Sequence, residues 1–440
     1  MKKKRRIVLC SIMTLVMALV MAMPISASAD VGESDVARIG DTGYTTVNAA
    51  IADAGEGDEI VLLKTVSEVL HFNKSCDIIL NLNNFTVDTT SVDSYDVVRV
   101  EAADVTLEIK NGTLKNTVGT AYGIYAFQNA SNLNLTLDNV TVETGDTSLG
   151  VQGLTSNSNV IVMNSRLTSE TTAIYYPPKS GTMEIINSVV TGVDNGIVHK
   201  GGNLKIKGDA TVITATGSAG EAEAPYGGDP NNPASFPKTG NAVYLEGGYT
   251  DREMFLTIEG GTFISENNQA VYQKSFGQPE DTIDTMISAG NFSSDVTQYV
   301  ENDRISIKYT DNSGSTYYVG TQAQINEIVK AAGAGDKIDV LQGDIALDIP
   351  TADVQITNSG TGEISVNGET VIAGETIMTK GQASTQLSTT TPADETTTAS
   401  NDKAVATGDD FNMTALLAIM GIAAAAAAGT VVYGRRKRSN

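Results

Sequence analysis

The chain has 440 residues, with 52 acidic and 29 basic side chains and a formal net charge of −23 at pH 7. A surface of this sign repels nucleic acid and anionic lipid, which argues against nucleic acid as a partner, and a polyanionic substrate would need a bridging cation. Glycine is abundant and tryptophan is absent, a composition typical of many short strands joined by turns.

The N-terminus predicts export from the cytoplasm. Five basic residues at positions 2–6 precede an apolar run from Ile7 to Met23, and Ala27-Ser28-Ala29 offers small residues for cleavage. We therefore predict a signal peptide over residues 1–29, followed by a short acidic lead over residues 30–43.

A capping helix and a strand are predicted to open the folded domain. One helical face carries the apolar residues Val47, Ala50, Ile51 and Ala54, and Gly55 suits the end of the helix. The strand follows from Ile60 to Leu63. The exposed end of a stacked sheet presents unpaired backbone groups, and a short amphipathic helix laid across that end protects them.

A degenerate phrase repeats from Leu80 to Gly290. It reads apolar-x-apolar-x-Asn or Gly, and its copies begin at Leu80, Leu107, Leu135, Val160, Met183, Leu204, Leu256 and Met286. This alternation indicates a strand with one buried face, and the final Asn or Gly suits a left-handed corner. A second strand phrase lies between the copies. We predict a chain wound into coils whose equivalent strands pair in parallel, with Leu107, Leu135 and Met183 stacked in one interior column.

The predicted fold is all-β, a parallel β-helix over residues 44–299 with short capping helices and an insertion over residues 214–240. The opening helix and strand and the coils, with turns such as Asp194-Asn195-Gly196-Ile197, resemble pectate-lyase-like β-helix proteins, a group that includes adhesive domains. The resemblance implies a right-handed winding. It does not extend to the calcium-binding acids and arginine base of the lyases, or to the paired aspartates of the polygalacturonases.

Beyond Tyr299 the opening phrase returns. Residues 332–338 repeat the Ala-Gly-x-Gly-Asp-x-Ile core of residues 54–60, which predicts a second cap-and-strand unit over residues 300–380. Its strands are expected near Ile345–Leu347, Val354–Ile356, Ile364–Val366 and Thr370–Ile372. This unit either closes the far end of the main stack or begins a truncated second one.

The C-terminal part predicts a tether. Residues 381–410 are rich in Thr and Ser and are interpreted as an extended stalk. In the final segment, residues 411–440, an apolar run from Met413 to Tyr433 is long enough to span a bilayer, and the basic residues that follow it should stay cytoplasmic.

This end also resembles the sorting signal of Gram-positive surface proteins, in which a sortase cuts between Thr and Gly and joins the Thr to the cell wall. The resemblance implies cleavage between Thr407 and Gly408, although the family's Leu-Pro is Ala404-Val405 here. A retained transmembrane helix is the alternative. Both readings tether the protein to the extracellular face, by the wall or by the membrane.

Residues that carry catalysis and metal binding are scarce. Cys10 lies in the predicted signal peptide, so Cys76 has no partner and is interpreted as a small buried hydrophobe. The only histidines are His71 and His199, which argues against a zinc site. Arg99 is the nearest candidate for a base, and a solvated outer-face residue is the simpler interpretation. No catalytic residue, metal site or cofactor is assigned; calcium stays open, because no spaced ladder of aspartates places it.

The strongest binding signal is a row of side chains predicted by the second phrase. If its central apolar residues point inward, the residues that follow them point outward and stack at the spacing of strands. This row consists of Tyr125, Gln152, Tyr175, Val198, Tyr244 and Tyr272. Outward tyrosines suit the stacking of sugar rings or the seating of a partner chain. Alternatively, the insertion or the C-terminal unit covers the row.

Together these features predict a surface-anchored β-helical adhesin or polysaccharide-binding protein without catalytic activity. Its expected partner is a polysaccharide, or a glycan or protein on a host or cell surface. One alternative is a surface-anchored polysaccharide lyase or glycoside hydrolase acting on uronic-acid-type glycans, which needs a calcium-dependent acid cluster in a groove. Another is a wall spacer without a ligand.

Overall fold

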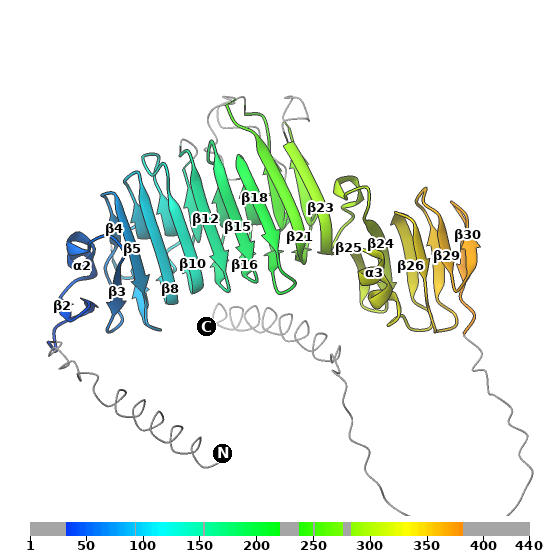
Figure 1. Ribbon diagram of the computed structural model, residues 1–440, viewed down its shortest axis with the longest axis horizontal. Helices are drawn as coiled ribbons and strands as arrows, with labels where there is room; N and C mark the ends of the chain where they lie inside the picture. The colour runs from blue at the N-terminus through cyan, green and yellow to red at the C-terminus, as the bar shows by residue number, and fades with distance from the viewer. Residues whose placement is uncertain are drawn as a thin grey trace, which may run out of the picture. The chain divides into compact units, whose positions relative to one another are not determined.

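The structure is a computed structural model, and it describes residues 32–92, 94–152, 155–220, 237–249, 251–275 and 283–381. Figure 1 shows the described strands lying side by side along the long axis of the molecule. The predicted all-β solenoid with parallel coils is confirmed. No helix among the described residues is long and apolar enough to cross a membrane.

Several predicted segments lie outside the described residues. These are the signal peptide at residues 1–29, most of the insertion at residues 214–240, the stalk beyond Gly381, and the transmembrane or sorting segment with Thr407 and Gly408.

Each coil contributes one strand to an eight-stranded sheet in which all neighbours run parallel. In spatial order its strands are β4 (Leu70–Phe72), β7 (Asp96–Val100), β9 (Tyr122–Ala126), β11 (Leu149–Val151), β14 (Thr172–Tyr176), β17 (Asn195–His199), β20 (Val243–Glu246) and β22 (Val271–Lys274). We call this the eight-stranded sheet.

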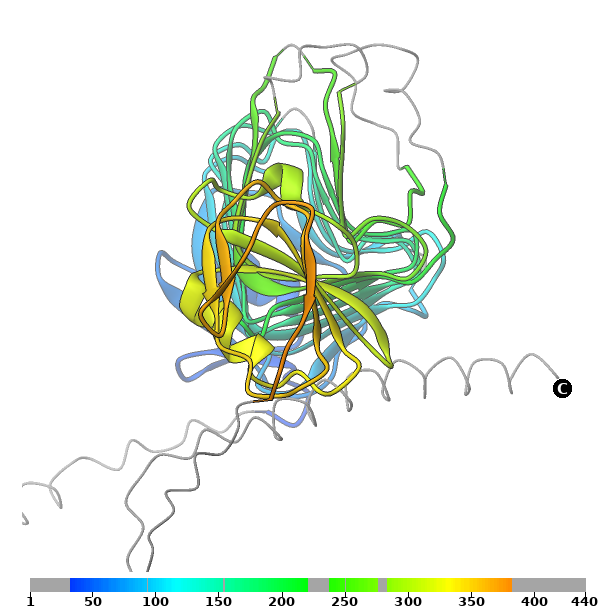
Figure 2. The same ribbon diagram turned by 90° about the vertical axis from the view of Figure 1, so that its right-hand side faces the viewer.

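The other walls of the coils belong to a twenty-stranded sheet. Its strands within the coils are β3 (Asp58–Leu62), β5 (Cys76–Asn81), β6 (Thr86–Asp88), β8 (Val105–Asn116), β10 (Asn134–Thr144), β12 (Ser158–Met163), β13 (Arg166–Ser169), β15 (Gly181–Ile186), β16 (Val189–Gly192), β18 (Gly202–Lys207), β19 (Val212–Ala215), β21 (Met254–Ser265) and β23 (Ile283–Phe292). Viewed down the stack, these walls enclose the core (Figure 2).

The predicted interior column is present. Leu135 is in register with Leu107 on one side and Val160 on the other, and Val160 is in register with Met183. All four side chains are buried. The column continues through Leu204 and Leu256, so each coil covers the apolar inner face of the next.

The left-handed corners are confirmed as well. Asn111, Asn139, Asn164 and Asn187 have φ angles of 58°, 56°, 51° and 47°, a region that asparagine tolerates better than most residues. The amide of Asn139 donates to the side-chain oxygen of Asn111 at 3.0 Å. The repeated asparagine therefore turns the chain and links adjacent coils.

The N-terminal end of the stack is closed by helix α2 (Val47–Asp53) and a hairpin. Thr46 caps the helix by accepting a hydrogen bond from Ala49 N, and Val47, Ala50 and Ile51 are buried beneath it. Strands β1 (Ala37–Ile39) and β2 (Thr42–Tyr44) form the hairpin, and β1 pairs antiparallel with β3.

At the far end the parallel winding stops at an antiparallel hairpin. The short helix η3 (Thr297–Tyr299) leads to β24 (Ile305–Asp311) and β25 (Gly314–Gly320), and β25 pairs antiparallel with β23. Helix α3 (Gln322–Val329) follows, with a capping box between Thr321 and Gln324.

A short second winding with its own apolar cluster comes after α3. It contains β26 (Lys337–Gln342), β27 (Ile345–Leu347), β28 (Gln355–Asn358), β29 (Ile364–Val366), β30 (Glu369–Val371) and β31 (Thr376–Met378). The pairs β26–β28 and β27–β29 are parallel. The hairpin thus ends the main stack, and the repeated phrase begins a truncated second one.

The interior column should dominate stability. We expect Leu135→Ala to lower the free energy of unfolding by about 2–5 kcal/mol, because a fully buried leucine leaves a cavity between two coils. Thr136→Ala, a half-exposed neighbour on the same strand, should change it by less than about 0.5 kcal/mol. Denaturant titration followed by circular dichroism measures both, and equal effects would argue against a shared core column.

Candidate functional site

One continuous row of residues runs along the outer face of the eight-stranded sheet. Strand register places its members in the order His71, Arg99, Tyr125, Gly150, Tyr175, Val198, Tyr244 and Tyr272. The predicted tyrosine row is therefore real, and it extends further toward the N-terminus than expected. The place of Arg99 in the row could have been predicted, because Val98-Arg99-Val100 has the same apolar-polar-apolar pattern as the other strands of this sheet.

Gln152 does not occupy the predicted rung. Leu149, rather than Val151, is in register with Ile124, so Gly150 stands beside Tyr125. Gln152 lies two residues further along, where its side-chain amide donates to the hydroxyl of Tyr125. The prediction was wrong by two residues because the phrase Leu149-Gly150-Val151 reads as a strand in either register.

The C-terminal half of the row is covered. Tyr175 and Tyr244 are 5% and 0% exposed, and they pack with Val198 and the half-buried Tyr272. The rings of Tyr244 and Tyr272 stack with centroids 6.0 Å apart. Of the two alternatives that the sequence left, an open row and a covered one, the covered one holds at Tyr175 and Tyr244, where the tyrosines serve as packing.

A buried ion pair lies beside these covered tyrosines. Lys200 Nζ is 2.8 Å from Glu246 Oε1, and both side chains are fully buried. The ammonium also lies 5.3 Å from the centroid of the Tyr175 ring, and Tyr249 donates to the same carboxylate. Burial lowers the pKa of Lys200, and the neighbouring carboxylate opposes that shift. Sequence reasoning missed this contact, which joins the coils of β17 and β20.

His199 points into the core. Its ring stacks on Tyr176 with centroids 5.8 Å apart, and Nε2 lies 3.1 Å from the carbonyl oxygen of Phe255. Burial lowers its pKa to about 4. His199 is therefore a packing residue of the coil.

The exposed half of the row is centred on three aromatic residues, Tyr122, Tyr125 and Phe127, which we call the aromatic rung. They come from β9 and the residue after it, and all three are half-buried. Ring centroids are 4.8 Å apart between Tyr122 and Tyr125 and 4.6 Å apart between Tyr125 and Phe127. On the far side Gly150 carries no side chain, and the Tyr125 ring packs over it: a Cβ there would lie 3.1 Å from Tyr125 Cδ2.

The neighbouring strand β7 and the residue after it supply Asp96, Arg99 and Glu101, which we call the charged rung. Arg99 Nε lies 3.3 Å from Asp96 and 3.4 Å from Glu101, and its guanidinium carbon lies 4.7 Å from the centroid of Phe127. His71, one strand further on, places Nδ1 3.2 Å from Glu101. Arg99 is therefore held between two carboxylates and an aromatic ring instead of being a freely solvated side chain.

The two carboxylates of the charged rung differ in burial. Only 8% of the Asp96 side chain is exposed, compared with 30% for Glu101. Burial raises the pKa of Asp96 to about 6, and Arg99 opposes the shift. A carboxyl group whose pKa is shifted by burial and by a charged partner marks a candidate functional site.

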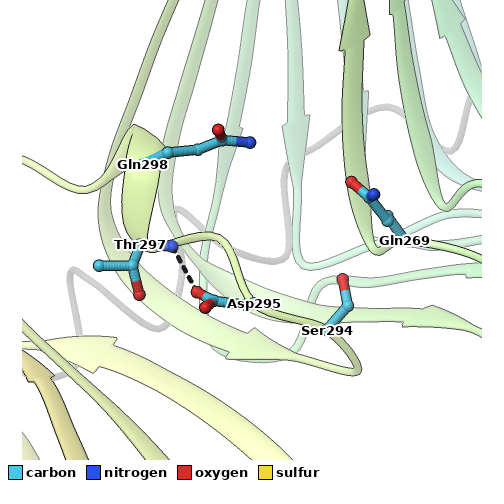
Figure 3. Close-up of a pocket in the computed structure, with 5 residues that line it drawn as sticks. All are labelled: Gln269, Ser294, Asp295, Thr297 and Gln298. Carbon is cyan, nitrogen blue, oxygen red and sulfur yellow. Dashed lines mark hydrogen bonds between the residues drawn. The ribbon is translucent and has the colours of Figure 1, made fainter. Parts of the chain in front are cut away.

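A polar pocket lies at the far end of the stack (Figure 3). Its lining residues are Gln269, Ser294, Asp295, Thr297 and Gln298. Thr297 N donates to Asp295 at 2.8 Å, and Ser294 accepts from Ala270 N at 2.8 Å. Gln269 and Gln298 lie on opposite sides of the pocket. It offers hydrogen bonds but no aromatic surface, so the aromatic rung is the stronger candidate.

Known metal-site patterns are missing from the part of the chain that the structure describes: no group of three or more His, Cys, Asp or Glu side chains there is placed to hold a metal ion. Comparisons with known proteins give no match, whether with family models, curated proteins or solved structures. The site must therefore be interpreted from its own chemistry.

Removing one partner of the buried ion pair should destabilise the protein more than removing both. Lys200→Met leaves the Glu246 carboxylate buried without its cation, so we expect a loss of about 3–5 kcal/mol in the free energy of unfolding. The double variant Lys200→Met/Glu246→Leu should recover most of that loss. Chemical denaturation of the three proteins checks this, and a single variant as stable as the wild type would contradict it.

His199 should make the protein sensitive to acid. Its pKa in the folded state, about 4, is below its ordinary value of 6.5. The unfolded chain therefore binds more protons between these pH values, and stability falls as pH falls through the window. In His199→Phe the decline in melting temperature from pH 7 to pH 4.5 should be shallower. If melting temperature falls with pH equally in the two proteins, the acid sensitivity does not come from His199.

Proposed function

We propose that this protein binds a glycan on the outer face of its eight-stranded sheet and that the aromatic rung is the platform. The observation that carries the proposal is the alignment of three half-exposed aromatic side chains beside a charged rung. Aromatic faces pack against the apolar faces of sugar rings, and polar groups at their edges bind the hydroxyls. No step of this proposal requires catalysis.

The surroundings of the aromatic rung support a sugar ligand. Arg99 lies over the Phe127 ring, Gln152 donates to the Tyr125 hydroxyl, and His71 stands one strand beyond Arg99. All of them stand on or beside paired strands of a long sheet. A platform fixed in this way loses little conformational freedom when a ligand binds.

The proposal includes display at the cell surface. Support comes from the basic and apolar N-terminal segment, the Thr-rich stretch, and the apolar run with its basic tail near the C-terminus. Anchoring through Thr407 by a sortase and retention of a membrane span are both consistent with these features. A stalk ahead of the anchor would hold the β-helix away from the surface.

One arrangement favours a second candidate function, that of a polysaccharide lyase. His71 contacts Glu101 through Nδ1, which leaves Nε2 as a possible base, and Arg99 stands on the next strand as a possible partner for a sugar carboxylate. Because Arg99 is already bound by Asp96 and Glu101, we rank this function below binding.

The aromatic rung can be tested directly. In the full-length protein, Tyr122→Ala/Tyr125→Ala/Phe127→Ala should lower binding on a glycan array by at least about tenfold, because each packed aromatic ring contributes about 0.5–1.5 kcal/mol and tenfold corresponds to about 1.4 kcal/mol. Phe255→Ala is the matched control: this aromatic residue is 36% exposed on β21, in the other sheet, and should leave binding unchanged.

Three results would count against the proposal. They are a triple variant that keeps the wild-type binding profile, an equal loss of binding in Phe255→Ala, and a wild type that binds no glycan. Release of unsaturated sugar, measured as ultraviolet absorbance in the same samples, would favour the lyase. Loss of that release in His71→Ala would assign the base.

A further inference from the structure

We infer that the ligand of the aromatic rung is an uncharged glycan, and that two or three of its consecutive sugar residues lie along β9, across the coil. The inference rests on the proposed function and adds the charge class, the length and the direction of the bound segment. It comes from three features of this face: the order of the aromatic rings, the groups on the neighbouring strands, and the seat of Tyr125 on Gly150.

The three rings follow one another along a single strand. Tyr122 and Tyr125 belong to β9, and Phe127 is the residue after its end. Neighbouring ring centroids are 4.8 and 4.6 Å apart, and the ring planes are tilted by 35° and 75° to one another. The spacing is close to the length of one sugar residue in a chain. The rings therefore present a short, twisted path for two or three consecutive residues.

This aromatic path does not continue onto the neighbouring coils. Strand register sets Arg99 of β7 on one side of Tyr125 and Gly150 of β11 on the other. Gln152 follows the end of β11 and donates to the hydroxyl of Tyr125. A glycan that stays on aromatic faces therefore follows β9 and meets polar groups along its edges, where they bind sugar hydroxyls.

The charged side chains at the edge of the path are already paired with one another. Arg99 contacts both Asp96 and Glu101, and Glu101 also contacts His71. A sugar carboxylate or sulfate has to compete with these acids for Arg99, and a sugar ammonium has to compete with Arg99 for the acids. Either exchange breaks one charge pair for each pair that it forms. Sugar hydroxyls bond to the paired groups without separating them, and the chain's overall charge of −23 further disfavours acidic glycans.

The middle ring of the path has its position set by Gly150. A Cβ on residue 150 would lie 3.1 Å from Cδ2 and 3.4 Å from Cε2 of Tyr125, so the ring leans over the next coil at the one point where no side chain stands beneath it. The hydroxyl of the same ring accepts a hydrogen bond from the Gln152 amide. These contacts fix the ring before a ligand arrives, which reduces the free-energy cost of binding. Gly150 is therefore a positioning residue.

The charge class is tested with the full-length protein on an array of neutral, carboxylated, sulfated and amino-sugar glycans. We expect the tightest ligands to be neutral, and their charged counterparts of the same length and linkage to bind at least about tenfold more weakly, because the added charge has to break an existing pair. Charged glycans that bind as tightly as their neutral counterparts, or more tightly, would overturn the inference.

The length and direction are tested with free oligomers of the tightest neutral glycan, from one to six residues, by isothermal titration calorimetry. Affinity should rise by at least about tenfold from one residue to three, because two further rings are reached, and should level off beyond four. A monomer that binds as tightly as the hexamer would contradict the footprint of two or three residues. A continued steep rise to six residues would contradict a path along β9.

Gly150 provides a readout that a purely structural role would not move. Gly150→Ala should shift the Tyr125 ring by a few tenths of an ångström and weaken binding of the three-residue oligomer by about threefold or more. In a Tyr125→Ala background the same substitution should have no further effect, because the ring that it displaces is gone. Gly119→Ala is the matched control, since a Cβ there meets no atom within 4 Å. Losses that add independently would remove Gly150 from the positioning of the ring.

The outcomes separate this inference from the proposed function. If charged glycans bind most tightly and the triple variant of the aromatic rung loses them, the uncharged class is overturned and glycan binding stands. If no glycan binds at all, both proposals fail. The array and the oligomer series use the wild-type protein, so they decide the inference even if a variant does not fold. Circular dichroism and the melting temperature of each variant confirm that it is folded.

Discussion

Register between successive coils is the constraint on which this structure depends. A single coil has an apolar inner face that it cannot bury, and it becomes stable only when the next coil lies in register above it. Leu107, Leu135, Val160 and Met183 satisfy this condition as one column. The asparagine corners maintain it, because they turn the chain at the equivalent point of successive coils, and Gly208 takes that place after Asn187. A slip of one residue would turn the aliphatic side chains outward.

The same register decides what the outer surface can do. When inner residues stack in columns, the outer residues form rows at the spacing of strands. Residues separated by some 25 positions in the chain, such as Arg99 and Tyr125, become direct neighbours on adjacent strands. Along this face the row changes from charged to aromatic and then to covered tyrosines. A single architectural rule thus produces both an open platform and a packed segment.

The two halves of the row place their charges in different environments. In the covered half, Lys200 and Glu246 are both fully buried and contact each other directly, so each is compensated by the other. In the open half, Arg99 is about one-third exposed and is shared between two acids. The excess of negative charge there is tolerated because solvent is near. Access to solvent thus separates a surface suited to recognition from one suited to packing.

Much of the architecture could be predicted from the sequence, because the period of the apolar residues and the terminal Asn or Gly act locally. They specify strands, corners and a parallel winding without knowledge of the rest of the chain, and the opening phrase marks both cap helices in the same way. The aromatic rung and its charged neighbour were only partly visible. Tyr125 could be placed in the row, and strand alternation puts Phe127 on the same face, but Tyr122 reaches Tyr125 through a side-chain direction that no repeat encodes. The position of Gln152 depended on a register that Gly150 left ambiguous. Burial of Tyr175 and Tyr244, and pairing of Lys200 with Glu246, were decided only by tertiary structure, because solvent exposure depends on what packs over a residue and not on its own coil.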